Sequence, residues 1–179
     1  MILILDGPDG AGKTIFARSL AYIFNLDYVK AYRIADETER QYRVLEDMKM
    51  IDEGVIKNVV YDRYYYPSDL VYEPTFHKRE SILRQHKEYI EKTFRENDVI
   101  FVYCTAAPSK LRERFKKTPQ DDLDSEHLEH VSKLYEEFIK EATVTVIVMD
   151  TTKGAIDDNI RTLAARIVNT KINKLVMEG

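Results

Sequence analysis

Short apolar runs alternate with longer amphipathic segments along the chain. Residues 2–5, 59–61, 99–103 and 144–149 have the length of strands and are rich in β-branched or aromatic side chains. A weaker run over residues 28–32 would form a fifth strand. Because the apolar residues in these runs are nearly continuous, the runs predict parallel strands that are covered on both faces.

The segments between these runs carry apolar residues at helical spacing. The first predicts a helix from Lys13 to about Phe24. Four further stripes consist of Tyr42, Leu45, Met48 and Ile51; Ile82, His86, Tyr89, Ile90 and Phe94; Leu128, Val131, Leu134, Tyr135, Phe138 and Ile139; and Ile156, Ile160, Leu163, Ala164 and Ile167. Such stripes are typical of helices that pack on a core. The alternation predicts an α/β fold, a five-stranded parallel sheet with helices on both faces.

Three segments depart from this alternation. Residues 64–74 are rich in aromatic side chains and contain two prolines, which predicts irregular structure. Residues 118–125 (TPQDDLDS) are polar and acidic, and they separate two helical stretches. Residues 171–179 would form a short C-terminal extension.

Composition narrows the class of protein. The chain has 179 residues, about one domain, with 44% hydrophobic and 32% charged residues. Its net charge of −4 disfavours a polymeric nucleic-acid partner, because such binders usually carry a basic excess. The single cysteine, Cys104, excludes an intrachain disulfide and favours a reducing compartment. The sequence has no apolar run long enough to span a bilayer and no secretory leader pattern. We therefore expect a single cytoplasmic domain over residues 1–179, with no membrane partner.

The strongest motif follows the first apolar run. Residues 7–14 (GPDGAGKT) fit the phosphate-loop pattern G-x-x-x-x-G-K-[ST] between a strand and a helix. Glycines let the backbone approach phosphates closely, and the loop N–H groups and the helix N-terminus then point at them. The lysine would neutralise phosphate oxygens, and the threonine hydroxyl would bind Mg²⁺. The predicted ATP-binding residues are Gly7, Asp9, Gly10, Ala11, Gly12, Lys13 and Thr14.

A second motif lies at residues 58–62 (NVVYD), where an apolar run of strand length ends in a carboxylate, Asp62. In an open α/β sheet, a carboxylate at the end of a neighbouring strand reaches the phosphate region, so Asp62 is a candidate partner of Mg²⁺ alongside Thr14. Arg63 follows directly, and its planar guanidinium is suited to bidentate contact with a phosphate. The alternative for Asp62 is an ordinary turn or helix-capping aspartate.

Together, residues 5–14 (LDGPDGAGKT) and 62–64 (DRY) resemble the thymidylate kinase and deoxynucleoside kinase group of P-loop kinases, with thymidylate kinases closer. The resemblance implies a three-layer P-loop fold and transfer of phosphate from ATP to dTMP, giving dTDP and ADP. It implies that Asp9 contacts the 3′-hydroxyl of the acceptor, that Asp62 serves the metal and the acceptor phosphate, and that Arg63 binds this phosphate. Deoxynucleoside kinases carry Glu-Arg-Ser at this place, so Asp-Arg-Tyr favours a monophosphate acceptor. For Asp9 a turn-forming role is the alternative.

The candidate lid covers residues 109 to about 125, in which a basic stretch over residues 109–117 is followed by the acidic residues of 118–125. A basic segment that closes over the phosphates fits phosphoryl transfer, which relies on positioning and on neutralising charge. In the family, members without an arginine in the phosphate loop take it from the lid, so Arg112 or Arg114 is the expected catalytic cation. The alternative is a solvated basic helix face.

The acceptor pocket is less clear from the sequence. Arg43 lies 19 residues before Asp62, near the place where the family has a base-contacting arginine. Tyr64 and Tyr66 are candidate acceptor-binding residues, although the tyrosines of this region, which include Tyr42, Tyr65 and Tyr72, either stack on a base or fill core space. The residues after Tyr64 depart from the serine- and glutamine-bearing stretch of thymidylate kinases, which leaves the base open.

Three functions therefore compete. The first is an ATP- and Mg²⁺-dependent kinase of a deoxynucleoside monophosphate. The second is a kinase of the free deoxynucleoside, which needs a general base for a neutral hydroxyl. The third is a nucleotide-binding P-loop protein without kinase turnover. A homodimer is compatible with the resemblance, but no sequence feature identifies an interface.

Overall fold

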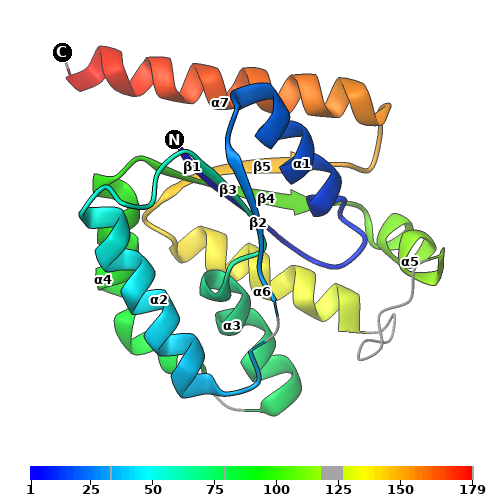
Figure 1. The fold of residues 1–179 in the computed structure, drawn as a ribbon. Coiled ribbons are helices and arrows are strands. Elements are labelled where there is room, and N and C mark those ends of the chain that lie inside the picture. Colours follow the sequence, from blue (N-terminus) through cyan, green and yellow to red (C-terminus); the bar gives the residue numbers. More distant parts are fainter. Residues whose placement is uncertain (33, 79, 118–126, 179) are drawn as a thin grey trace.

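A five-stranded parallel sheet forms the centre of the computed structural model, which describes residues 1–32, 34–78, 80–117 and 127–178. The strands are β1 (Ile2–Asp6), β2 (Asp27–Lys30), β3 (Val59–Asp62), β4 (Val99–Thr105) and β5 (Thr145–Asp150). Their order is β2-β3-β1-β4-β5, and every pairing is parallel (Figure 1). The predicted strands, including the weak one near residue 28, are confirmed.

Helices cover both faces of this sheet. They are α1 (Lys13–Phe24), α2 (Glu37–Asp52), α3 (Tyr65–Tyr72), α4 (Lys87–Glu96), α5 (Pro108–Lys117), α6 (His127–Glu141) and α7 (Ile156–Glu178). In Figure 1, α1 and α7 lie on one face, whereas α2, α3, α4 and α6 lie on the other. The predicted three-layer α/β fold is therefore confirmed.

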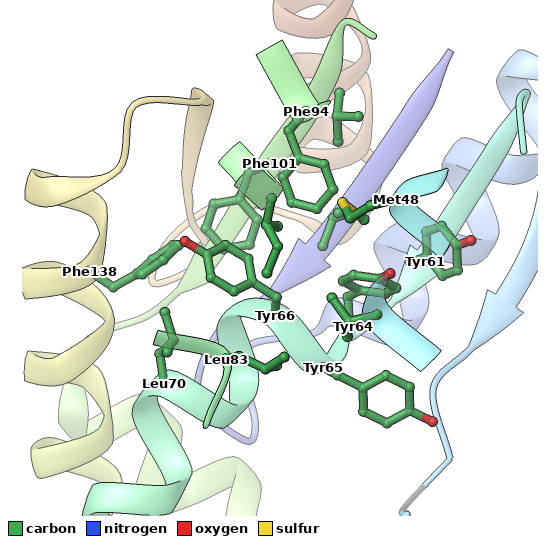
Figure 2. Packing of buried hydrophobic residues seen from close by; sticks show 14 of the residues in the cluster. Met48, Tyr61, Tyr64, Tyr65, Tyr66, Leu70, Leu83, Phe94, Phe101 and Phe138 are labelled. Carbon is green, nitrogen blue, oxygen red and sulfur yellow. The ribbon is translucent and has the colours of Figure 1, made fainter. Parts of the chain in front are cut away.

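Each central strand contributes to two cores, because successive side chains point to opposite faces. Ile2 and Ile4 of β1 face the helices α2, α3, α4 and α6, while Leu3 and Leu5 face α1 and α7. All four are at most 4% exposed. The first core is rich in aromatic rings (Figure 2).

The order of the strands places a topological switch point at the end of β1. The chain leaves β1 for β2 on one side, and it later crosses to β4 on the other side. Such a switch point leaves a crevice outside the carboxyl ends of the strands, where ligands bind in open α/β sheets. In the register, Leu5 lies beside Asp62 and Asp6 lies beside Tyr103, so the two predicted motifs meet at this edge.

The segment predicted to be irregular is only partly helical. Residues 65–72 form α3, but Tyr66 within it has non-helical angles (φ −102°, ψ +115°) and the Tyr66–Pro67 peptide bond is cis. A π-helical turn follows over Glu73–His77, so the predicted irregularity is present on both sides of the regular turns of α3. The predicted C-terminal extension is instead the last part of α7, which continues to Glu178.

Three predicted stripes were partly wrong, and on α7 the first residue of the stripe, Ile156, is 43% exposed. On α2 the buried apolar residues are Val44, Met48 and Ile51, whereas Tyr42 is 67% exposed. A strict three-residue spacing turns by about 60° per step around a helix of 3.6 residues per turn, so it cannot stay on one face. The stripe from residue 82 is split into a 3₁₀ turn (Ile82–His86) and α4, and Tyr89 faces solvent.

Candidate active site

The phosphate loop packs directly against β4. Gly7, Gly10 and Gly12 have φ angles of +140°, +80° and +85°, which glycine adopts without the steric cost of a side chain. A Cβ atom built on Gly7 would lie 2.0 Å from the carbonyl oxygen of Cys104. Only glycine fits there, as the motif predicts, and α1 begins at Lys13 directly after the loop.

Lys13 is folded back over its own loop. Its Nζ donates to the carbonyl oxygens of Gly7 at 2.9 Å and Pro8 at 2.8 Å, and it lies 3.9 Å from Asp9 Oδ1. Burial, together with the nearby charge of Arg63, lowers the pKa of Lys13 to about 8. The ammonium group is therefore poorly solvated and is held where a phosphate can replace the carbonyl oxygens.

Thr14 and Asp62 meet at the carboxyl ends of β1 and β3. Thr14 Oγ1 donates to Asp62 Oδ2 at 2.7 Å, and Tyr28 Oη from β2 donates to the same oxygen at 2.8 Å. Burial and the hydrogen bond to Asp62 raise the pKa of Tyr28 above its ordinary value. Tyr28 was missed at the sequence level because nothing in a short edge strand marks one tyrosine.

The adjacent oxygens of Thr14 and Asp62 fit Mg²⁺, which prefers hard oxygen ligands and usually binds through one or two carboxylates plus substrate phosphates. In the part of the chain that the structure describes, no group of three or more His, Cys, Asp or Glu side chains could hold a metal by itself. A Mg²⁺ ion at this place would take its remaining ligands from water and from the phosphates of a nucleotide.

Arg63 lies between two carboxylates beside the loop. It forms an ion pair with Asp9, and its Nη1 is 3.5 Å from Asp6 Oδ1 and 3.3 Å from Tyr72 Oη. Burial opposes its charge, but the interactions with Tyr72 and the two aspartates raise the pKa of Arg63 well above its ordinary value. The guanidinium is thus fixed in place and always charged. Its backbone φ of +66° lies in the left-handed region.

Asp6 connects this arginine to the surrounding elements. The carboxylate is fully buried and accepts hydrogen bonds from Gly7 N, Tyr135 Oη and Ser68 Oγ, at 2.8, 2.8 and 2.6 Å. Sequence reasoning assigned it no role. The signal that could have found it is a single carboxylate at the end of an otherwise apolar strand, because a buried charge needs partners.

A cavity of about 430 Å³ adjoins the loop on the side of α5 and α7. Its lining comes from the phosphate loop, α1, α5 and the segment after β5, and includes Gly10, Phe115, Thr151 and Asn159. Arg114 borders the cavity and donates to Thr151 Oγ1 at 2.8 Å, to the Thr151 carbonyl oxygen at 2.8 Å and to the Gly10 carbonyl oxygen at 3.2 Å.

The two lid arginines therefore have different surroundings. Arg114 contacts the phosphate loop, whereas Arg112 pairs with Glu129 on α6. The basic stretch up to Lys117 forms helix α5. The remainder of the predicted lid, residues 118–125, lies outside the described residues.

The predicted acceptor-pocket tyrosines lie in the core. Tyr66 is 1% exposed, its hydroxyl donates to Glu91 at 2.7 Å, and its ring packs edge-on against Phe138 (Figure 2). Tyr64 is also buried, and its hydroxyl donates to Asp47 at 2.9 Å. These contacts argue against a direct role of either ring in binding the acceptor. The sequence could not distinguish stacking on a base from core packing.

Arg43 is half exposed and lies 3.3 Å from Asp47 on the same helix, so its guanidinium is held beside α2. The arginine that α2 directs towards α3 is Arg40, which was not predicted. It is buried, and it pairs with Asp69 at 2.8 Å and Glu73 at 2.5 Å. Burial raises the pKa of Asp69, although Arg40 opposes the shift.

Among the described residues, none of the helices is both long and apolar enough to cross a bilayer. No protein-family model matches the chain, and no curated sequence matches it either.

Solved structures, by contrast, share the fold over nearly the whole chain. The YorR protein from Bacillus subtilis, in complex with phosphorylated GDP, has a TM-score of 0.77 at 21% identity, covering 93% of this chain and 95% of that one. Deoxyadenosine kinase from M. mycoides with bound dCTP has a TM-score of 0.64 at 18% identity, covering 94% of this chain and 100% of that one. Shikimate kinase from Acinetobacter baumannii in complex with shikimate has a TM-score of 0.56 at 16% identity, covering 95% of this chain and 94% of that one. These likenesses show that the chain shares the fold of these proteins.

Proposed function

We propose that the protein transfers the γ-phosphoryl group of Mg²⁺-bound ATP to a deoxynucleoside monophosphate, with dTMP as the first candidate. The observation that carries this proposal is the permanently charged Arg63, held by Asp6 and Asp9 beside the phosphate loop. A phosphate-bearing acceptor needs such a cation near the transfer point, and a guanidinium can contact a phosphate through two N–H groups.

The donor half of the site supports ATP. The loop N–H groups and Lys13 would bind the phosphates, and the cavity of about 430 Å³ has a volume typical of small-molecule sites. Thr14 and Asp62 would hold Mg²⁺, which neutralises phosphate charge when it is bound with the nucleotide. Arg114, at the edge of this cavity, is the lid arginine that we assign to the transferring phosphoryl group, in place of Arg112.

The acceptor half rests on the pair formed by Arg63 and Asp9. An incoming phosphate would compete with Asp9 for the guanidinium, because both are anions. Once released, the Asp9 carboxylate can accept a hydrogen bond from a sugar hydroxyl, the role that the resemblance implies. Asp6 keeps Arg63 in position, since its own partners on α3 and α6 hold it in the buried layer.

The second candidate is a kinase of the free deoxynucleoside. One observation favours it: deoxyadenosine kinase from M. mycoides is among the structures that share this fold. In that case a carboxylate at the site would act as general base on a neutral hydroxyl. A protein that binds nucleotides without turnover is the third candidate.

The deciding experiment is an ADP-release assay with ATP and Mg²⁺ against all nucleosides and nucleoside monophosphates, in the ribo and deoxyribo series. We expect turnover with deoxynucleoside monophosphates and little with free nucleosides. Efficient turnover of thymidine, deoxycytidine or deoxyadenosine with inert monophosphates would establish the second candidate instead. ADP binding without any turnover would leave the third.

A further inference from the structure

Tyr28 is the residue outside the two motifs that contacts the candidate metal site. It lies on the edge strand β2, where the register places it beside Val60 of β3. Both side chains belong to the core beneath α1. Asp62 follows Val60 by two residues and so points to the same face, because side chains alternate along a strand. The phenol therefore reaches along β3 to the carboxylate.

The hydrogen bonds at Asp62 show how its carboxylate is held. Within the described residues, Thr14 Oγ1 and Tyr28 Oη both donate to Oδ2, at 2.7 and 2.8 Å. Two hydrogen bonds from different elements to Oδ2 restrict rotation of the carboxylate group. The direction in which the other oxygen, Oδ1, points is therefore fixed as well. The tyrosine ring is itself supported, since the guanidinium carbon of Arg18 on α1 lies 5.5 Å from the ring centroid.

The two donors have different roles. Thr14 is a candidate ligand of Mg²⁺, so its own position changes with occupancy of the site. Tyr28 is not a candidate ligand, and it is fixed by the sheet and by α1. It can therefore hold Asp62 whether or not a nucleotide is present. Groups that orient a metal-binding carboxylate without touching the metal commonly change metal affinity by ten- to a hundredfold when removed.

We propose that Tyr28 is a positioning residue that orients Asp62 for Mg²⁺ in the nucleotide complex. This inference rests on the donor half of the proposed function, namely a Mg²⁺–nucleotide complex held by Thr14 and Asp62. It does not depend on which acceptor is phosphorylated or on whether transfer occurs.

The test is the Mg²⁺ dependence of nucleotide binding in the variant Tyr28→Phe, measured with the fluorescent analogue mant-ADP. In EDTA, the variant should bind mant-ADP within about twofold of the parent, because the phosphate loop is unchanged. The Mg²⁺ concentration that gives half of the affinity gain should rise about tenfold. The control is Tyr65→Phe, which removes a hydroxyl that donates to the Tyr32 carbonyl oxygen at 2.9 Å, and it should leave this midpoint unchanged.

A double-variant comparison separates positioning from general damage. In an Asp62→Ala background, Tyr28→Phe should cause no further change in the Mg²⁺ midpoint, because the group through which it acts is gone. An unchanged midpoint in Tyr28→Phe would overturn the inference, as would a parent protein whose mant-ADP affinity ignores Mg²⁺. A parent that shows the Mg²⁺ effect but transfers no phosphate would contradict the proposed function alone.

Discussion

At the scale of single residues, both cations of the candidate site already have polar partners in the structure. Arg63 pairs with Asp9, and Lys13 donates to the carbonyl oxygens of Gly7 and Pro8. In the proposed function, each cation lies where a phosphate would bind. The cost of separating these partners is offset only by a ligand of comparable negative charge, which favours phosphates over neutral molecules.

Replacing Arg63 by alanine tests whether the acceptor carries a phosphate. With deoxynucleoside monophosphates, kcat/KM should fall at least about a hundredfold, because removing one member of a partly buried charge pair costs on the order of 2–5 kcal/mol. Any side activity on free nucleosides should fall far less. Steady-state kinetics with both acceptor classes measures this difference, and equal losses for the two would contradict phosphate binding by Arg63.

At the scale of elements, the packing of the phosphate loop against β4 and α5 determines which residues can act on a ligand. The loop approaches β4 so closely that Gly7 has no room for a side chain. On its other side, Arg114 of α5 ties the loop to the end of β5 through Thr151. Three elements therefore fix the loop, and each contact can be tested separately.

Gly7→Ala should lower the free energy of unfolding for two reasons: the positive φ at this position and a steric clash of the added Cβ. The added Cβ would meet the Cys104 carbonyl oxygen at 2.0 Å, and overpacking typically costs about 1–3 kcal/mol. Gly54→Ala is the matched control, because Gly54 also has a positive φ (+68°) but has no heavy atom within 4 Å of the added Cβ. Urea unfolding should give a clearly larger loss for Gly7→Ala, and mant-ADP binding should be lost only there. Equal losses would mean that the loop can shift away from β4.

Arg114→Ala and Arg112→Ala form a pair that distinguishes the two lid arginines. If Arg114 stabilises charge on the transferring group, its loss should lower kcat about a hundredfold or more. The KM for ATP should change much less. Arg112→Ala should change kcat less than about twofold, since Arg112 pairs with Glu129 at the surface. A raised KM for ATP with normal kcat in Arg114→Ala would show that Arg114 only anchors the loop.

At the scale of the whole molecule, the buried ammonium of Lys13 makes folding stability depend on pH. Its folded pKa of about 8 lies below the ordinary value of 10.5. Below pH 8, Lys13 is protonated in both the folded and the unfolded protein. The full cost of burying its charge then lowers the free energy of unfolding. Between about pH 8 and 10.5 the unfolded chain binds more protons, so the free energy of unfolding rises with pH.

The rise due to Lys13 should be on the order of 3 kcal/mol, and it should disappear in Lys13→Met. Urea unfolding of both proteins between pH 7 and 10 measures it, because groups common to the two cancel in the difference. Relative to the variant, the parent should gain stability as the pH increases above 8. A pH-independent difference would mean that Lys13 keeps its proton in the folded protein.

The sequence by itself determined the sheet and the phosphate loop. Continuous apolar runs such as residues 99–103 have one stable outcome in this context, a strand covered on both faces. The loop motif is also readable from neighbours along the chain, because Lys13 Nζ donates to the carbonyl oxygens of Gly7 and Pro8 within the same motif. Such features depend on neighbours along the chain, and a pattern of residue types is enough to predict them. The close contact of Gly7 with Cys104 is the exception, since β4 supplies it.

Tertiary structure alone decided which side chains reach the site. Asp6 is held by Tyr135, which is 129 positions away, and Asp62 is held by Tyr28, which is 34 positions away. Only the folded sheet brings such pairs together. The same holds for the difference between Tyr66 and Tyr28: both are tyrosines in apolar surroundings, yet one hydroxyl donates to Glu91 in the core and the other to Asp62. Composition and spacing do not determine which residues a side chain contacts. Strand order and helix packing do, because they place each side chain beside one set of partners.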